Sequence, residues 1–250
     1  MEICSTPRYS VIIPVFNSNL VLVELHQRIR TVFNSDVRQS FEIILVDDGS
    51  SNPATWPRIS ELAEHNEEVL GIQLQKNYGQ HAALICGMSH AKGDYLITMD
   101  DDLQQSPEDI PALIRLREHD VVMGQFRRRK HSTVRNMGSF AKAYLDLIIS
   151  GKPKGLRVSS FCLIRKPIAE KILANFRTPM PLFSSLLFGA TRDIIGVEVS
   201  HSARQEGKSG YSMVMLTGMF FRVLNNKSSR SVQQLPFEIR RRINKHQNMI

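Results

Sequence analysis

The chain is poor in cysteine: its 250 residues include three, Cys4, Cys86 and Cys162. An odd number of scattered cysteines, without the spacing of metal ligands, argues against a disulfide framework and a cysteine-based metal site. This usage is typical of a reducing compartment, so we expect the protein to be cytoplasmic.

The chain also lacks any apolar run of the roughly 18 residues that a membrane-spanning helix needs. Its N-terminus has no basic segment followed by an apolar stretch, so we expect no signal peptide. The hydrophobic fraction of 42% and the charged fraction of 22% are ordinary for a globular protein and exclude bulk disorder. The length fits one domain.

Acidic residues are the minority, 24 against 32 basic ones, and the formal net charge is +8. A basic surface favours a polyanionic partner such as nucleic acid, anionic lipid or a phosphorylated substrate. The same charge also serves solubility alone, so composition leaves the partner open.

Short apolar runs alternate with segments of helical period over the first half of the chain. The apolar runs predict strands at 10–15, 41–46, 69–74, 95–99 and 120–124. The segments of helical period predict helices at 20–33, 59–65 and 79–91. This alternation predicts an α/β fold, Rossmann-like, with a mostly parallel central sheet and helices on both faces. Ligands of such sheets bind at the carboxyl ends of the strands. Past residue 125 the alternation blurs, apart from a helix predicted at about 133–149.

Three aspartates follow the fourth predicted strand directly. In an extended chain Asp100 and Asp102 project to one side, Asp101 to the other, and Gln104 returns to the first side. Oxygen ligands that converge in this way suit Mg²⁺ or Mn²⁺. The alternative is an acidic turn that caps the next helix, but Ser106 is expected to provide that cap.

A second acidic pair, Asp47 and Asp48, ends the second predicted strand before Gly49 and Ser50. Taken alone, Asp-Gly-Ser is commonly a simple turn. Two acidic strand ends in one parallel sheet favour a binding site instead. We expect Asp47 to accept a hydrogen bond from a nucleobase N–H, with Asp48 nearer the ribose or a metal.

Several motifs, in order along the chain, carry a resemblance to a known family: 10–17, 44–50, 76–80, 99–104, 159–165 and 201–211. The first, second and fourth resemble the inverting family 2 glycosyltransferases with the GT-A fold. The others are similar to the polyprenyl-phosphate branch, which includes dolichol-phosphate mannose synthases and bacterial undecaprenyl-phosphate sugar transferases. The resemblance extends over roughly residues 8 to 224.

The resemblance implies a set of site residues. Those expected to bind the nucleotide-sugar donor, a UDP, GDP or dTDP sugar, are Pro14, Phe16, Asn17, Asp47, Asp48, Gly79, Gln80, Asp100, Asp101 and Ser209. Those expected to hold the metal against the diphosphate are Asp100, Asp102 and Gln104. Arg204 and Ser209 would lie on a mobile loop that closes over the phosphates, and Asp102 and Arg204 would act in catalysis.

The chain departs from the family pattern at two places. Ser18 stands where the family often has Glu, so no role is assigned to position 18. Phe126 stands where the family often has Arg, so Arg127 or Arg128 would have to serve instead.

The segment 178–192 corresponds to the place where relatives that glycosylate hydroxyls carry an acidic residue, and here it contains no carboxylate. A phosphate acceptor is already anionic and needs no general base. We therefore expect a lipid phosphate acceptor, bound by Arg127, Arg128 and Arg135. A solvated basic loop is the equal alternative for these arginines.

The predicted catalytic domain covers residues 1–225 and ends in an apolar helix at 213–224, too short to cross a bilayer. That helix suits the membrane interface or, alternatively, core packing. Residues 226–250 form a basic tail that anionic lipid would attract, or else a solvated, disordered tail. We expect peripheral attachment to the inner face of the plasma membrane and no nucleic-acid partner.

The leading hypothesis is a transferase that loads a sugar onto polyprenyl (undecaprenyl) phosphate in cell-surface polysaccharide or lipopolysaccharide biosynthesis. One alternative is a transferase of the same fold that extends a lipid-linked saccharide, such as an O-antigen or capsule unit. The other is a non-catalytic protein that binds a sugar nucleotide or a nucleic acid. The identity of the acceptor separates the first two.

Overall fold

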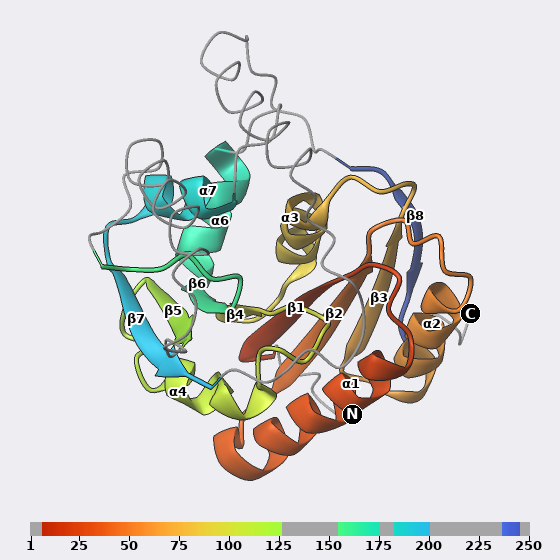
Figure 1. Ribbon diagram of the computed structural model, residues 1–250, viewed down its shortest axis with the longest axis horizontal. Coiled ribbons are helices and arrows are strands. Elements are labelled where there is room, and N and C mark those ends of the chain that lie inside the picture. The colour runs from red at the N-terminus through yellow and green to blue at the C-terminus, as the bar shows by residue number, and fades with distance from the viewer. Residues whose placement is uncertain (1–6, 127–154, 176–182, 201–236, 246–250) are drawn as a thin grey trace, which may run out of the picture.

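The computed structural model describes residues 7–126, 155–175, 183–200 and 237–245. These residues form one eight-stranded sheet with helices on both faces (Figure 1). The strand order is β7-β5-β6-β4-β1-β2-β3-β8. The predicted α/β fold with a mostly parallel central sheet is confirmed.

The described strands are β1 (Tyr9–Val15), β2 (Phe41–Asp47), β3 (Val69–Leu74), β4 (Tyr95–Thr98), β5 (Val121–Phe126), β6 (Cys162–Arg165), β7 (Ile194–Val199) and β8 (Ile239–Ile243). The described helices are α1 (Leu20–Val32), the π-helical η1 (Phe33–Val37), α2 (Thr55–His65), α3 (Gln80–His90), the 3₁₀ turn η2 (Pro107–Asp109), α4 (Ile110–Ile114), α6 (Lys166–Asn175) and α7 (Phe183–Ala190). The predicted strands and helices of the first half are all present, and α2 contains the predicted helical segment 59–65.

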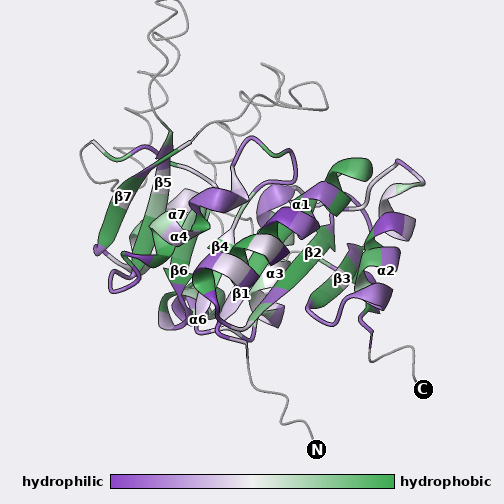
Figure 2. Ribbon diagram, turned by 90° about the horizontal axis from the view of Figure 1, so that it is seen from below, coloured by the Kyte–Doolittle hydropathy of each residue, from purple (hydrophilic) through white to green (hydrophobic). Residues whose placement is uncertain are grey.

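The central strands are buried because helices cover both faces of the sheet. Side chains such as Ile13 and Leu45 pack on one face against α1, α2 and α4, and Ile12 and Ile44 pack on the other against α3, α6 and α7. Every residue of β1 is buried. This two-sided burial explains why the central strands β1 and β2 are mostly apolar in the sequence (Figure 2).

The order in which the chain adds strands to the sheet reverses at β1. β1 pairs in parallel with β2 on one side and with β4 on the other. The loop after β1 and the loop after β4 therefore leave the carboxyl ends of neighbouring strands where the strand order reverses, which is where ligands of open α/β sheets bind. We call this place the switch point. The ladder between the two strands ends where Ile12 pairs with Thr98.

β8 differs from the expectation that residues 226–250 form a tail outside the domain. It pairs antiparallel with β3, with Arg242 opposite Ile72. The guanidinium of Arg241 lies 6.0 Å from the ring centroid of Trp56 on α2. An edge strand needs only backbone partners on one side, and charged side chains suit its open edge. Three consecutive arginines give no alternating apolar signal, so the sequence did not reveal this strand.

No helix in the described part of the chain is both long enough and apolar enough to cross a membrane. The helices predicted at 133–149 and 213–224 lie outside the described residues.

Candidate active site

The predicted site residues of the first half lie in or beside the four loops at the carboxyl ends of β1, β2, β3 and β4. Side-chain hydrogen bonds join neighbouring loops, and the partners of each polar residue show which loops it connects. Phe16, at the end of β1, keeps 47% of its surface exposed. Pro14 is buried within β1 just below it.

Asp47 is fully buried at the end of β2. One carboxylate oxygen accepts from the backbone N–H of Ser50 at 2.9 Å, and the other from Nε2 of Gln73 at 2.8 Å. Each carboxylate oxygen has two lone pairs. A nucleobase N–H would therefore share an oxygen that already has a donor within the protein.

Asp48 faces the loop after β3, and its place near the ribose or metal stays a prediction. Its two carboxylate oxygens accept from the backbone N–H groups of Tyr78 and Gly79, at 2.8 and 2.9 Å. Burial raises the pKa of Asp48 to about 6, and the charge of Asp47 adds to the rise, while the two N–H donors oppose it. Gly79, with φ +97°, precedes α3, so Asp48 fixes the start of that helix.

Asn17 joins the loop after β1 to the loop after β2. Its side-chain oxygen accepts from the backbone N–H groups of Ser51 and Asn52, both at 2.9 Å, and its own N–H donates to Oγ of Ser50 at 2.8 Å. Its φ is +61°, in the left-handed region that asparagine tolerates better than most residues. The side-chain oxygen of Asn17 is thus engaged in shaping the site.

Asp100 is held by three neutral donors. One carboxylate oxygen accepts from Nε2 of Gln80 at 2.6 Å, and the other from Nε2 of Gln105 and Oγ of Ser160, both at 2.7 Å. Burial raises the pKa of Asp100 to about 6, and the neighbouring charges of Asp102 and Asp101 add to the rise. The structure brings Gln80 and Asp100 together, as residues of one predicted site.

Gln105 and Ser160 were not assigned to the site from the sequence. The side-chain oxygen of Gln105 also accepts from the backbone N–H of Asp100 at 2.9 Å, and only 3% of Gln105 is exposed. The expectation that an extended chain returns Gln104 to the side of Asp100 is wrong. The chain turns here, with Leu103 at φ +57°, and this turn brings Gln105 onto Asp100.

Asp101 faces the loop after β1. One of its oxygens accepts from Oγ of Ser18 at 2.6 Å and from the backbone N–H of Phe16 at 3.2 Å. Burial raises the pKa of Asp101, against the hydrogen bonds from Ser18 and Phe16. Ser18, to which the sequence assigned no role, is therefore the partner of a predicted site residue.

The predicted cap at Ser106 is wrong. Ser106 precedes η2 but makes no side-chain cap. Its hydroxyl donates to Glu108 and accepts from Arg28, which forms an ion pair with Glu108 at 2.6 Å. One reason to expect a metal at the aspartates after β4 was that Ser106 would cap the next helix, and the structure does not support that reason.

Among the described residues, no three His, Cys, Asp or Glu side chains form a group that could hold a metal ion. The bonds of Asp100 and Asp101 lead to different donors, which separates their carboxylates. Asp102 accepts from the backbone N–H of Gln104 at 3.1 Å. Carboxylate and carboxamide oxygens at this loop are of the type that Mg²⁺ and Mn²⁺ prefer, and the donors to half-buried Asp100 within the described residues are neutral. A divalent cation therefore fits the loop chemically.

The remaining predicted residues, Arg127, Arg128, Arg135, Arg204 and Ser209, lie outside the described residues. Of the segment 178–192, α7 is described. It packs against α6, and its side chains Phe183 and Leu187 belong to the hydrophobic cluster on that face of the sheet.

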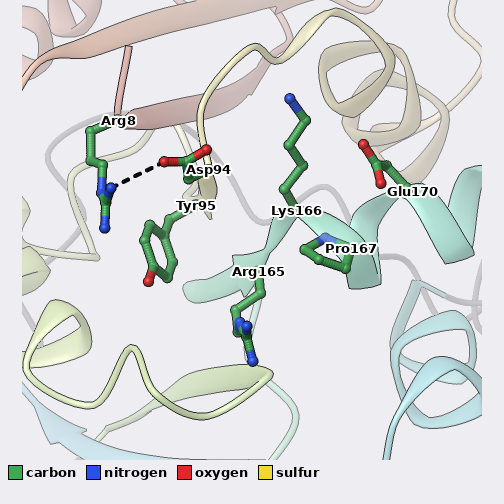
Figure 3. A pocket seen from close by; sticks show the side chains of 7 residues that line it. All are labelled: Arg8, Asp94, Tyr95, Arg165, Lys166, Pro167 and Glu170. Carbon is green, nitrogen blue, oxygen red and sulfur yellow. Dashed lines mark ion pairs between the residues drawn. The ribbon is translucent and has the colours of Figure 1, made fainter. Parts of the chain in front are cut away.

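A separate hollow of about 290 Å³ lies at the opposite edge of the sheet, where β4 begins and β6 ends (Figure 3). Arg8 pairs there with Asp94 at 3.2 Å, and Arg165 pairs with Asp120 at 3.4 Å. None of the predicted site residues lines this hollow. The polar loops at the carboxyl ends of the strands are therefore the candidate site.

The family model described as glycosyl transferase family 2 matches residues 10–173. The chain belongs to this family. Curated relatives include the undecaprenyl-phosphate 4-deoxy-4-formamido-L-arabinose transferases of Salmonella choleraesuis and Salmonella typhimurium, each 33% identical over 218 residues. The match covers 86% of this chain and 65% of each relative, so the chain spans less than two thirds of their length.

Solved structures of glucosyl-3-phosphoglycerate synthase from Mycobacterium tuberculosis share the fold. One, in complex with UDP, has a TM-score of 0.59 at 17% identity and covers 87% of this chain and 78% of that chain. Another, with Mn²⁺, UDP-glucose and phosphoglyceric acid, has a TM-score of 0.61 at 15% identity and covers 98% and 92%. The predicted GT-A fold of this family 2 chain is confirmed.

Proposed function

We propose that this family 2 protein is a metal-dependent inverting glycosyltransferase that moves a sugar from a nucleotide diphosphate to a polyprenyl phosphate. The observation that carries the proposal is the position of the Asp100–Asp102 loop at the switch point, beside the exposed ring of Phe16. These two neighbouring loops thus offer oxygen ligands for a cation and an aromatic side chain for a nucleoside. The names of the undecaprenyl-phosphate transferases from Salmonella support the acceptor class.

The donor would lie across the loops after β1 and β2. Phe16 contributes its exposed ring, and Asp47 provides acceptors for a base N–H. Asn17, through the backbone of Ser51 and Asn52, holds these two loops together. The donor class, a UDP, GDP or dTDP sugar, is supported by the UDP-glucose complex of the mycobacterial neighbour.

Asp100 and Asp102 would hold the divalent cation, Mg²⁺ or Mn²⁺. The Mn²⁺ in the mycobacterial neighbour supports this assignment. When bound, the cation neutralises negative charge that develops on the leaving diphosphate. The chain's own part is orientation, because Gln80 and Gln105 hold the carboxylate of Asp100 from both of its oxygens.

The acceptor step is a direct displacement. An oxygen of the acceptor phosphate forms a bond to the anomeric carbon as the bond from that carbon to the diphosphate breaks, and the nucleoside diphosphate leaves. Attack from the opposite face inverts the anomeric centre. The segment 178–192 contains no carboxylate, which agrees with an acceptor that needs no general base.

Residues outside the described part of the chain would complete the site. Arg127, Arg128 and Arg135 would bind the acceptor phosphate, and Arg204 and Ser209 would donate to the diphosphate as their loop closes. The apolar segment 213–224 and the basic residues that follow would attach the protein to the anionic inner face of the plasma membrane. Within that basic region, Arg240 and Arg241 on β8 are exposed.

The test screens UDP, GDP and dTDP sugars with the purified protein, with and without undecaprenyl phosphate, in Mg²⁺, in Mn²⁺ and in excess chelator. We expect one donor to give a glycosylated lipid phosphate only when lipid and metal are both present. Transfer to a saccharide hydroxyl instead would favour the extension of a lipid-linked saccharide. Nucleotide binding without turnover of any donor would favour the non-catalytic alternative.

A further inference from the structure

Four side chains join the loops of the site into a closed ring. Asn17 links the loop after β1 to the loop after β2, and Asp48 links the loop after β2 to the loop before α3. Gln80, at the start of α3, bonds to Asp100 in the loop after β4. Asp101 returns from that loop to the loop after β1 and closes the ring.

The closing link crosses the switch point. The backbone ladder between β1 and β4 ends at Ile12 and Thr98, with one further bond from the N–H of Met99 to the carbonyl of Ile12 at 3.2 Å. Beyond Met99, the carboxylate of Asp101 connects the loop after β4 to the loop after β1. It reaches both the hydroxyl of Ser18, at 2.6 Å, and the backbone of the loop, at 3.2 Å.

The three consecutive aspartates therefore have different tasks. Asp100 is turned toward Gln80, Gln105 and Ser160, whereas Asp101 is turned toward the loop after β1. A carboxylate that accepts a hydroxyl and a backbone N–H from one loop fixes the position of that loop. Charged hydrogen bonds of this kind stabilise more than neutral ones.

We propose that Asp101 and Ser18 are positioning residues that fix the loop after β1 relative to the carboxylate loop after β4. The consequence for the donor rests on the proposed function, because a nucleotide diphosphate would contact both loops at once. Binding to loops that are already held in place costs less conformational entropy than binding to loops that must first be ordered. Loss of the link then raises the KM for the donor by about tenfold, which is the effect expected of one charged hydrogen bond, and changes kcat less.

The first measurement is hydrogen exchange in the nucleotide-free protein, read on peptides that cover residues 15–22. Asp101→Ala should speed their exchange about tenfold, and Ser18→Ala, a milder change that keeps the bond to Phe16, should speed it less. The double variant should be no faster than Asp101→Ala, because both changes remove one link. Asp94→Ala is the matched control, since Asp94 lies at the other end of β4 with an exposed ion pair to Arg8.

The second measurement exchanges the two groups. Ser18→Asp combined with Asp101→Ser keeps one hydroxyl and one carboxylate at the link, so it should restore both slow exchange and the donor KM relative to Ser18→Asp alone. Unchanged exchange in Asp101→Ala would overturn the proposal, as would a fall in kcat with an unchanged KM, which would make Asp101 a ligand of the reacting groups. If the wild type turns over no sugar nucleotide, the proposed function fails, while the exchange data still decide the link.

Discussion

Gly49 lies where the loop after β2 passes closest to the loop after β3. Its φ is +63°, and a Cβ added there would lie 2.2 Å from the carbonyl carbon of Lys76 and 2.5 Å from the nitrogen of Asn77. Backbone atoms cannot rotate away as a side chain can. To reach an ordinary contact of 3.4 Å instead of 2.2 Å, the loops would have to separate by about 1.2 Å.

That separation would stretch the bonds that Asp48 accepts from Tyr78 and Gly79, now 2.8 and 2.9 Å long. A hydrogen bond to a charged group contributes about 1.5–3 kcal/mol, and a left-handed φ costs a residue with a Cβ about 1–2 kcal/mol. We therefore expect Gly49→Ala to lower the free energy of unfolding by about 2.5–5 kcal/mol, the sum of the strain and of the loss of one of the two bonds.

Urea unfolding followed by the fluorescence of Trp56, the single tryptophan, measures this loss. Gly155→Ala is the matched control, because Gly155 has φ +82° and no atom of the described residues lies within 4 Å of an added Cβ. It should cost about 1–2 kcal/mol of backbone strain alone. Equal destabilisation by the two variants would refute the close approach of the loops as the cause.

Three further predictions concern the site and its surroundings. Asp102→Ala or excess chelator should abolish donor turnover while the circular dichroism of the fold persists; full activity in chelator would contradict the metal assignment. Gln105→Ala should lower the free energy of unfolding by about 1–3 kcal/mol, because the buried N–H of Asp100 loses its acceptor; unchanged urea curves would contradict this. The hydrogen bond from Arg28 lowers the pKa of Glu108 to about 2. The ionised carboxylate of Glu108 therefore contributes its full stabilisation above pH 4.5, and this stabilisation is lost as the pH falls toward 2. In Glu108→Gln the free energy of unfolding should depend less on pH over that range. Parallel curves of unfolding free energy against pH for wild type and variant would contradict the pairing of Glu108 with Arg28.

The sequence by itself determined the sheet and the edge that carries the site. Buried parallel strands need apolar side chains on both faces, so β1 and β2 are visible as apolar runs, and the polar residues that end them are visible by contrast. Because parallel strands end at one edge, the order of strands and helices along the chain was enough to assign Asp47 and Asp100 to the same edge. The motifs around them were also sufficient to predict the family.

The tertiary structure alone decided what each polar group contacts. Asp101 meets Ser18 across 83 positions of sequence, and Asp48 meets Gly79 across 31, separations at which no local spacing predicts a hydrogen bond. An extended chain would bring Gln104 to the side of Asp100. The turn with Leu103 at a positive φ brings Gln105 into contact with Asp100 instead. The spacing of apolar residues along the sequence indicates which side chains are buried, because burial follows the period of a strand or helix. The direction of a carboxylate depends on donors that the fold brings from other loops, and this information exists only once the chain has folded.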